Sequence, residues 1–520
     1  MDEKIYKEGK KNGYFWFLIF KCLMITTIEL QQVIRSLKKS EKRYFTDRTL
    51  KLNPDGTKYL ELFELLDKVE LKDDKFDLSL TTLNLKKNFS YTQNYLYSTL
   101  MDELVNFRKQ NDIEHKIKNE LAHFKILHER NLLPLASKVL KNAEKLAIRY
   151  EYLDLQLSVL ELRKNLIKHN KSKSSLSKDF EKLNAKREKL KTKIDLLDKL
   201  KFQLNKVYEL SRNGFELRNP AQRMELNQIL NRVEQLEIDS KMGFKILFYY
   251  YVILETIHTK LGKSSEKFGL LIIDLFKLYK QFKEIDLVGY SKSLLNYVQS
   301  AIEENKAFKA KVFVAELRDL ERKATSKGQF FLASLINEGL LVTQYYINND
   351  NNDRDATVES IEKLNKYLEI NDISLFKKMW YMHSIPIYFF KNDKTHKALE
   401  WCNALLQIPV SQGVNYSFYA KLKILEIILH FELGNYLLLP NLVETNEKYL
   451  KKHMVYFETE NVLFKLFRNK VFFENSLKTK RVKIFKQAHD SLKMLYLINS
   501  YEAEELKTIN YLDWFDKQLS

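Results

Sequence analysis

The pair Glu120 and His123 comes closest to a metal site, because it places a carboxylate and an imidazole three positions apart. On a helix this spacing brings both side chains to one face, which is the geometry of metal sites inside helical bundles. His128 falls off that face, and no second pair of this kind follows in the sequence. We therefore interpret His123 as a surface or helix-capping residue, and we expect neither a metal nor another cofactor.

The sequence lacks four common motifs of nucleotide-binding loops and enzyme active sites. It contains no GxxxxGK[ST], GxGxxG, GxSxG or HExxH, the patterns typical of nucleotide binding, dinucleotide binding, serine hydrolysis and zinc proteolysis. The ten histidines are scattered along the chain. We predict that the chain is not an enzyme, while a helical fold by itself would not dictate this.

Four consecutive aromatic residues, Phe248 to Tyr251, are candidates for lining a ligand groove. Consecutive positions on a helix point in all directions around its axis, so one groove cannot receive all four rings. We expect most of them to pack in the core between helical layers.

Two basic stretches are candidate contacts for an anionic partner. The second stretch alternates charged with apolar residues, a pattern that fits lipid headgroups or RNA but is more often a solvated helix face. The candidate residues are Lys38, Lys39, Lys42 and Arg43 near the N-terminus, and Lys480, Arg481 and Lys483 near the C-terminus.

The overall charge of +19, from 87 Lys and Arg against 68 Asp and Glu, also invites an anionic partner. Lysine far outnumbers arginine, however, and Asn, Ile, Phe and Tyr are abundant, which is typical of an AT-rich coding sequence. Arginine supplies the planar fork that reads base edges, so its scarcity counts against sequence-specific nucleic-acid binding.

Glycine and proline, the residues that interrupt helices, are rare: 12 and 6 of 520 residues. Hydrophobic residues make up 45% of the chain, enough for a substantial core. Cys22 and Cys402 are far apart and form no metal or redox spacing. The composition therefore predicts an all-α protein of a reducing, cytoplasmic compartment.

Residues 1–23 are predicted to be an N-terminal extension. The apolar run from Tyr14 to Ile25 is interrupted by Lys21 and is shorter than the roughly 20 residues of a membrane-spanning helix. Thr26 and Glu29 have the spacing of a capping box, so the first helix of the fold should begin there.

Residues 24–110 are predicted to form a helical cap, with a second capping box at Ser90 and Gln93. Short helices with a basic rim also fit a helix-turn-helix whose reading helix is 90–107. That helix carries few Lys or Arg residues, and its tyrosines are typical of packing positions. We favour the structural cap.

Residues 111–239 are predicted to be helix hairpins, with a coiled-coil-like segment at 174–238. One long helix near 174–212 should carry its seam, and the helix over 220–236 could fold back on it or leave it to a second copy of the chain. We favour the internal hairpin because the loop is short. Leucine recurs at every seventh position at Leu176, Leu183, Leu190, Leu197 and Leu204.

Residues 240–520 are predicted to form tetratricopeptide-like repeats, in which helices A and B of each hairpin present large and small residues at spacings that let them nest. The matches are individually weak, but together they indicate a degenerate α-solenoid. The framework positions are Ile385, Phe389, Ala398, Cys402, Leu405, Gly434 and Tyr436.

Three segments resemble an uncharacterised bacterial family of helical, tetratricopeptide-like proteins. They are SLKKSEKRYF at 36–45, FSYTQNYLY at 89–97 and FELGNY at 431–436. The resemblance covers the chain from about Met24 onward and implies a repeat fold. It implies no activity and no catalytic residue.

These observations favour a non-catalytic protein-protein interaction scaffold. We expect the A helices between 240 and 450 to line a concave face, where lysines would select an acidic protein or peptide. The alternative is a nucleic-acid-associated regulator that uses the basic N-terminal cap.

Overall fold

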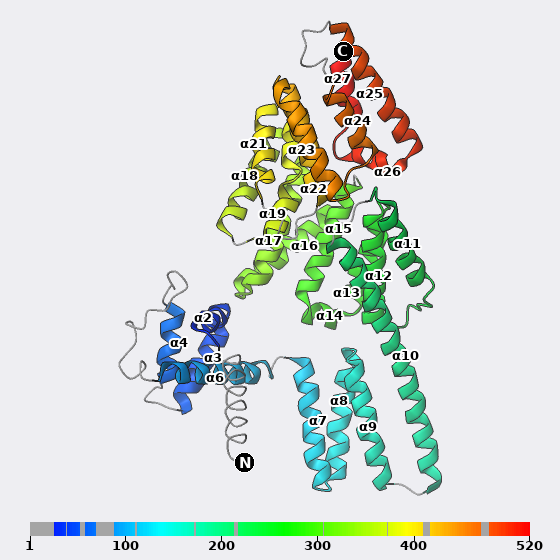
Figure 1. Ribbon diagram of the computed structural model, residues 1–520. Coiled ribbons are helices and arrows are strands. Elements are labelled where there is room, and N and C mark those ends of the chain that lie inside the picture. The colour runs from blue at the N-terminus through cyan, green and yellow to red at the C-terminus, as the bar shows by residue number, and fades with distance from the viewer. Residues whose placement is uncertain are drawn as a thin grey trace, which may run out of the picture. The chain divides into compact units, whose positions relative to one another are not determined.

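The prediction of an all-α protein is confirmed. The structure is a computed structural model, and its described residues contain helices and no strand (Figure 1). Residues 1–23, with the extension predicted there, lie outside the described part. The described residues are 25–37, 39–52, 58–68, 88–109, 112–170, 173–212, 217–304, 306–371, 373–408, 416–469 and 478–520.

The chain divides into two compact units, Met1–Glu188 and Lys189–Ser520. The division falls inside α10 (Lys173–Arg212), so the predicted boundary at 239/240 lies within the second unit. The other helices of the first unit are α2 (Thr27–Ser36), α3 (Lys39–Leu52), α4 (Lys58–Lys68), α6 (Phe89–Lys109), α7 (Ile113–Glu129), α8 (Leu133–Arg149) and α9 (Leu153–Asn170).

The N-terminal cap has its own core, built around Leu30, Phe45 and Leu100. The predicted capping box is confirmed: Glu29 N–H donates to Thr26 Oγ1 at 3.3 Å, and Thr26 N–H donates to Glu29 Oε2 at 2.7 Å. The hydrogen bonds from Thr26 also lower the pKa of Glu29. The local sequence thus fixes the start of α2.

The second predicted capping box is wrong, because Ser90 lies inside α6 rather than before it. The Gln93 side chain makes tertiary contacts instead. Its amide nitrogen donates to the Ile25 carbonyl, and its amide oxygen accepts from Thr27 Oγ1 at 3.0 Å. Gln93 therefore ties α6 to the start of α2.

Helices α7, α8 and α9 form consecutive antiparallel hairpins around a second core of the first unit. Small side chains let α8 approach its neighbours closely, because Ala136, Ala143 and Ala147 are all buried on one face of it. This is the sequence pattern expected of nested repeat helices.

Helix α10 is the long helix predicted near 174–212, and its seam leucines Leu183, Leu190, Leu197 and Leu204 are buried. The Leu176 side chain lies outside the described ones. Helix α11 (Pro220–Glu234) packs more closely against α12 (Phe244–Lys260) than it packs against α10. Lys193 of α10 donates to the Met242 carbonyl, just before α12. The internal hairpin of 174–212 with 220–236 therefore stays a prediction, and the contact seen for α11 is the one with α12.

Among its described residues, the second unit contains one hydrophobic core built from residues in the range 244–336 and another from residues in the range 345–515. Its remaining elements are α13 (Glu266–Leu278), α14 (Lys280–Ile285), α15 (Leu287–Glu303), α16 (Ala307–Ser326), α17 (Phe330–Asp350), α18 (Arg354–Ile370), α19 (Leu375–Met382), α20 (Ile385–Lys391), α21 (Thr395–Leu406), α22 (Tyr416–Glu432), η3 (Tyr436–Leu438), α23 (Leu439–Lys452), α24 (Glu458–Phe467), α25 (Lys478–Ile498), α26 (Ser500–Ala503), η5 (Glu504–Lys507) and α27 (Tyr511–Leu519). Helices adjacent in sequence pack as neighbours, as in a solenoid.

The turns between paired helices explain how the chain folds with so little glycine. Asn352, Asp393 and Gly434 each adopt a left-handed conformation after a helix, and the paired hydrogen bonds of a Schellman motif surround each of them. They are spaced by about 41 residues, an interval longer than the 34 residues of a tetratricopeptide repeat. Asparagine and aspartate tolerate this conformation, so glycine is not required at every turn.

We expect Gly434→Ala to destabilise the protein by about 1 kcal/mol and Met454→Gly to stabilise it by a similar amount. Both residues occupy left-handed turn positions, with φ of 73° and 56°. A Cβ at Gly434 would meet no atom within 4 Å, so the effect there is conformational rather than steric. Urea-induced unfolding of the two variants measures it, and changes of the same sign in both would contradict the turn argument.

Candidate functional site

The repeat-framework residues are structural. Ile385 and Phe389 of α20 and Ala398, Cys402 and Leu405 of α21 lie together in one core. Burial raises the pKa of the Cys402 thiol, which points to the Leu422 carbonyl at 3.3 Å. These residues hold the hairpin together and are not accessible to a partner.

The basic rim of the N-terminal cap is partly neutralised within the cap. Lys42 forms an ion pair with Asp67, and Arg43 lies 3.5 Å from Asp47. Lys39 is exposed, and Lys38 lies outside the described residues. Internal pairing leaves less positive charge for an external anion than the sequence indicated.

The expected lysine-lined face of A helices is not present on α17, α20 and α22. Helix α17 contains no lysine. Lys423 of α22 donates to Asn446 Oδ1 at 3.0 Å, and burial lowers its pKa. Helix α20 carries one lysine, Lys391, which is exposed at the end of that helix. These three helices therefore do not form a lysine-lined face.

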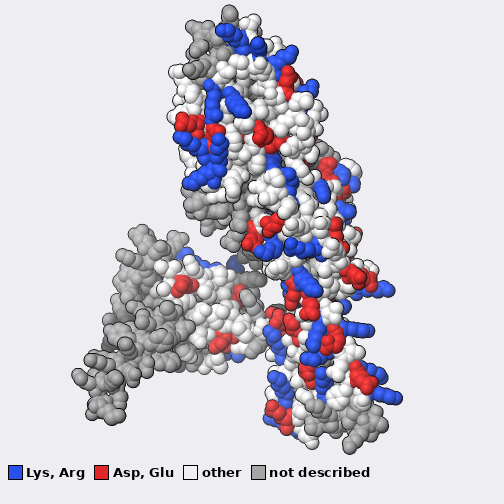
Figure 2. All heavy atoms as spheres, turned by 45° about the vertical axis from the view of Figure 1, so that its right-hand side comes forward, with Lys and Arg blue, Asp and Glu red and all other residues white. Residues whose placement is uncertain are grey.

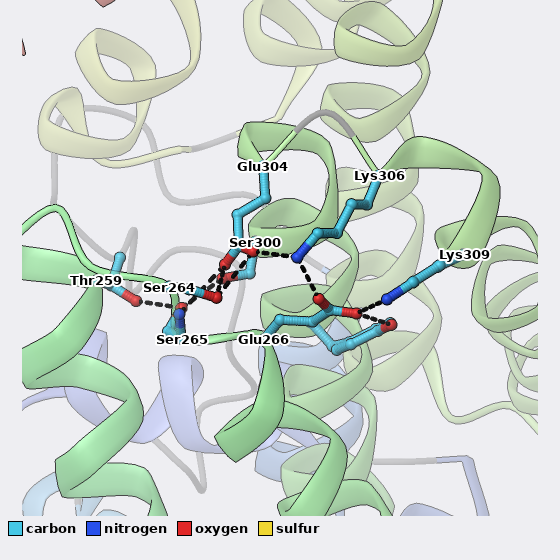
Figure 3. A network of polar contacts seen from close by, with 9 residues as sticks. Thr259, Ser264, Ser265, Glu266, Ser300, Glu304, Lys306 and Lys309 are labelled. Atoms are coloured by element: carbon cyan, nitrogen blue, oxygen red, sulfur yellow. Dashed lines mark hydrogen bonds and ion pairs between the residues drawn. The ribbon is translucent and has the colours of Figure 1, made fainter.

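A polar network joins α13, α15 and α16, with Glu266 at its centre (Figure 3). The Glu266 carboxylate accepts from Lys306 Nζ at 2.6 Å and from Lys309 Nζ at 2.7 Å. The hydrogen bonds from Lys306 and Lys309 lower the pKa of Glu266, so its carboxylate is held ionised. Both lysines project from the start of α16 toward α13.

Hydroxyl groups extend this network toward α12. Glu304 accepts from Ser264 Oγ and from Lys306 Nζ, at 2.9 Å and 2.7 Å. Ser265 Oγ lies 2.6 Å from Ser300 Oγ and accepts from Thr259 Oγ1 at 2.9 Å. The nucleophilic hydroxyls are thus engaged with one another, and no histidine belongs to the network drawn in Figure 3. Its geometry is that of a helix connector.

Glu266 also accepts from Tyr297 Oη at 3.4 Å, and this combination of a carboxylate with lysine and tyrosine donors recurs twice farther along the chain. Glu316 accepts from Tyr290 Oη at 2.7 Å and from Lys283 Nζ at 2.9 Å. Glu338 accepts from Lys377 Nζ at 2.8 Å and from the Tyr381 hydroxyl, whose pKa is raised by burial and by this bond. Each carboxylate joins helices of neighbouring hairpins. None of these contacts was predicted from the sequence.

A buried cluster around Arg218 joins the start of α11 to helices α24 and α26. Arg218 Nη1 donates to both carboxylate oxygens of Glu460, at 2.8 Å and 3.0 Å, and lies 3.6 Å from Glu502 Oε2. Thr459 Oγ1 donates to Glu502 at 2.6 Å. The Arg218, Glu460 and Glu502 side chains are only 2%, 0% and 5% exposed. The cluster thus closes a contact between segments far apart in sequence.

The outer face of α25 carries lysines that the rest of the described chain does not neutralise. We name it the α25 face and define it by Lys480, Lys483, Lys486, Lys493, Met494, Leu497 and Ile498. The four lysines are exposed, and none of them forms an ion pair with any described residue. Arg481 is half-buried instead, and its guanidinium lies 5.5 Å from the centre of the Tyr436 ring.

The C-terminal end of the α25 face is apolar. Met494, Leu497 and Ile498 are 57%, 74% and 79% exposed, although Leu492 and Tyr496 on the opposite side are buried. In Figure 2 basic and acidic side chains alternate over the lower part of the coloured surface, whereas blue predominates near the upper end. An apolar cluster next to unpaired lysines is a suitable surface for another molecule.

The remaining sequence candidates do not assemble into a site. On α7 His123 is exposed and Glu120 is half-buried, and no group of three or more His, Cys, Asp or Glu in the described ranges is placed to hold a metal ion. Tyr249 to Tyr251 are half-buried on α12, and Phe248 packs against the core. None of the described helices combines the length and apolar character needed to cross a membrane.

Comparisons with protein-family models, curated proteins and solved structures returned no match. Function must therefore be inferred from the geometry of this chain. Lys480 and Lys483 were predicted from the sequence, whereas the apolar end of the α25 face was not. The signal that could have revealed it was the helical spacing of three, three, seven and four positions from Lys480 through Lys483, Lys486 and Lys493 to Leu497.

Proposed function

We propose that this chain is a non-catalytic helical-repeat scaffold that binds another protein. The observation that carries the proposal is the α25 face, where unpaired lysines adjoin exposed apolar side chains. The exposed apolar side chains cost free energy in water, and a complementary protein surface would cover them and pair with the lysines.

The polar clusters of the second unit support binding rather than turnover. Glu266, Glu316 and Glu338 each accept hydrogen bonds from lysine and tyrosine side chains. A catalytic acid or base needs a substrate within hydrogen-bonding reach, and these carboxylates instead connect helices. Their arrangement fits a rigid frame that holds a binding surface in place.

The proposal includes a tetratricopeptide-like character and a cytoplasmic location. Tetratricopeptide-like character is supported by the stacked hairpins and by the resemblance of 36–45, 89–97 and 431–436 to the uncharacterised bacterial family. A cytoplasmic location is supported by cysteine usage, since Cys402 is free and buried.

We expect the tagged full-length chain, purified from its native cells after nuclease treatment, to retain at least one protein partner that rebinds directly once both are purified. Mass spectrometry identifies the partner, and titration calorimetry measures the rebinding. Retention that disappears with nuclease would favour the alternative of a nucleic-acid regulator. Turnover of a substrate by the purified chain would contradict the non-catalytic assignment.

A further inference from the structure

We propose that the α25 face binds an amphipathic helix of a partner protein, with acidic residues at one end of that helix and apolar residues at the other. The inference rests on the proposed function and adds the location of the site and the chemistry of the partner. It follows from the order of exposed side chains along α25.

The exposed residues of α25 share one side of the helix. At 100° per residue, Lys480, Lys483 and Lys486 fall on the same half of the helical surface as Leu497 and Ile498. Lys483 and Leu497 are about 20 Å apart along the axis at 1.5 Å per residue. A partner segment that contacts both must be elongated, and a helix of about four turns has this length.

Charge complementarity identifies the partner's polar end as acidic. The lysine end of the face projects three ammonium groups from two turns of α25, and none of them is paired among the described residues. Asp490, farther along the face, lies 3.1 Å from Nδ1 of the neighbouring His489. Carboxylates opposite the three lysines would therefore gain ion pairs without displacing existing ones.

The distribution of side chains favours a protein segment over a lipid surface. A helix that lies on a membrane exposes apolar residues along its whole length. On α25 the exposed large apolar side chains are confined to the last two turns, at Met494, Leu497 and Ile498. The apolar end therefore suits a compact cluster of Leu-like residues on a partner helix.

The face also lacks the groups that recognise nucleic acid. Single strands are bound by aromatic rings that stack on bases, and duplex DNA is read by arginine. The exposed residues of α25 include neither an aromatic ring nor an arginine, because Arg481 is half-buried beside Tyr436.

A labelled alanine-based helical peptide of about 20 residues tests the inference, with three Glu in its first half and three Leu in its second. We expect it to bind the full-length chain in fluorescence anisotropy. The triple variant Lys480→Glu, Lys483→Glu, Lys486→Glu should weaken binding at least about tenfold. Leu497→Ser with Ile498→Ser should weaken it to a similar extent.

The matched control reverses Lys138, Lys141 and Lys145 of α8, which are also exposed at helical spacing and unpaired among the described residues. Binding should be unchanged in this control, and unfolding of all variants should match the wild type. A peptide with Lys in place of Glu should not bind. Peptide affinity that is insensitive to the α25 substitutions, or no peptide binding at all, would overturn the inference.

Two further probes separate the other occupants. Vesicles containing phosphatidylserine and single-stranded DNA are each tested against the same variants, and a loss confined to either probe with no peptide binding would overturn the inference. If a natural partner is retained equally by the wild type and the α25 variants, the assigned site is wrong while the scaffold function stands. If no protein is retained by the wild type, the proposed function itself fails.

Discussion

Arg218→Met is expected to lower the free energy of unfolding by about 3–5 kcal/mol, the cost of leaving buried charges without their partner. Methionine preserves much of the volume and the contact with Phe457, whose ring centre lies 4.5 Å from the guanidinium. It removes the positive charge from Glu460 and Glu502, which are almost completely buried. Urea-induced unfolding of the full-length chain, followed by circular dichroism, measures the loss.

The matched control is Arg322→Met on α16. Arg322 is 75% exposed and lies 3.5 Å from Asp319, so its ion pair is hydrated. Exposed pairs contribute about 0–1 kcal/mol. Equal effects of the two substitutions would mean that the Arg218 cluster does not hold α11 to α24 and α26.

Glu255→Gln is expected to stabilise the protein by about 2–3 kcal/mol at pH 8 and to have little effect at pH 4.5. Glu255 is a buried carboxyl of α12, and burial raises its pKa from 4.5 to about 7. A Cβ on Gly269 would lie only 3.0 Å from Glu255 Oε1, which shows how tightly α13 covers the group. At high pH the folded chain must accommodate a charge that the unfolded chain keeps in water.

Proton binding by Glu255 explains why its effect on stability becomes less favourable as the pH rises. Between pH 4.5 and about 7 the folded state retains a proton on Glu255 that the unfolded state has released, so this group's contribution to stability falls as pH rises through that window. Glutamine has no charge and loses this dependence.

Urea-induced unfolding at pH 4.5, 6 and 8 measures the difference between wild type and variant. The exposed Glu359, paired with Lys363 on α18, provides the control substitution Glu359→Gln. A difference between the Glu255 variant and the wild type that does not change with pH would contradict the assignment of a protonated, buried carboxyl.

The helical fold was predictable because its signals are local. A scarcity of glycine and proline favours helix wherever apolar residues recur at helical spacing, and the Thr26 capping box needs only residues three positions apart. These features depend on neighbours along the chain, which the sequence displays directly.

The candidate site was predictable only in part, because pairing of charges depends on which helices meet. Lys42 and Lys483 look alike in sequence, yet α4 brings Asp67 to Lys42, whereas no described acidic residue pairs with Lys483. Gln93 has the spacing of a capping residue but contacts Ile25 across the cap.

The sequence by itself determined the helices, the Thr26 cap and the apolar faces that make the helices pack, since these follow from spacing along one segment. Only the tertiary structure decided which polar groups are buried and with what partner. Arg218 and Glu460 are 242 positions apart and meet inside a core, where the loss of hydration makes each depend on the other. Such long-range juxtaposition leaves no periodic trace in the sequence.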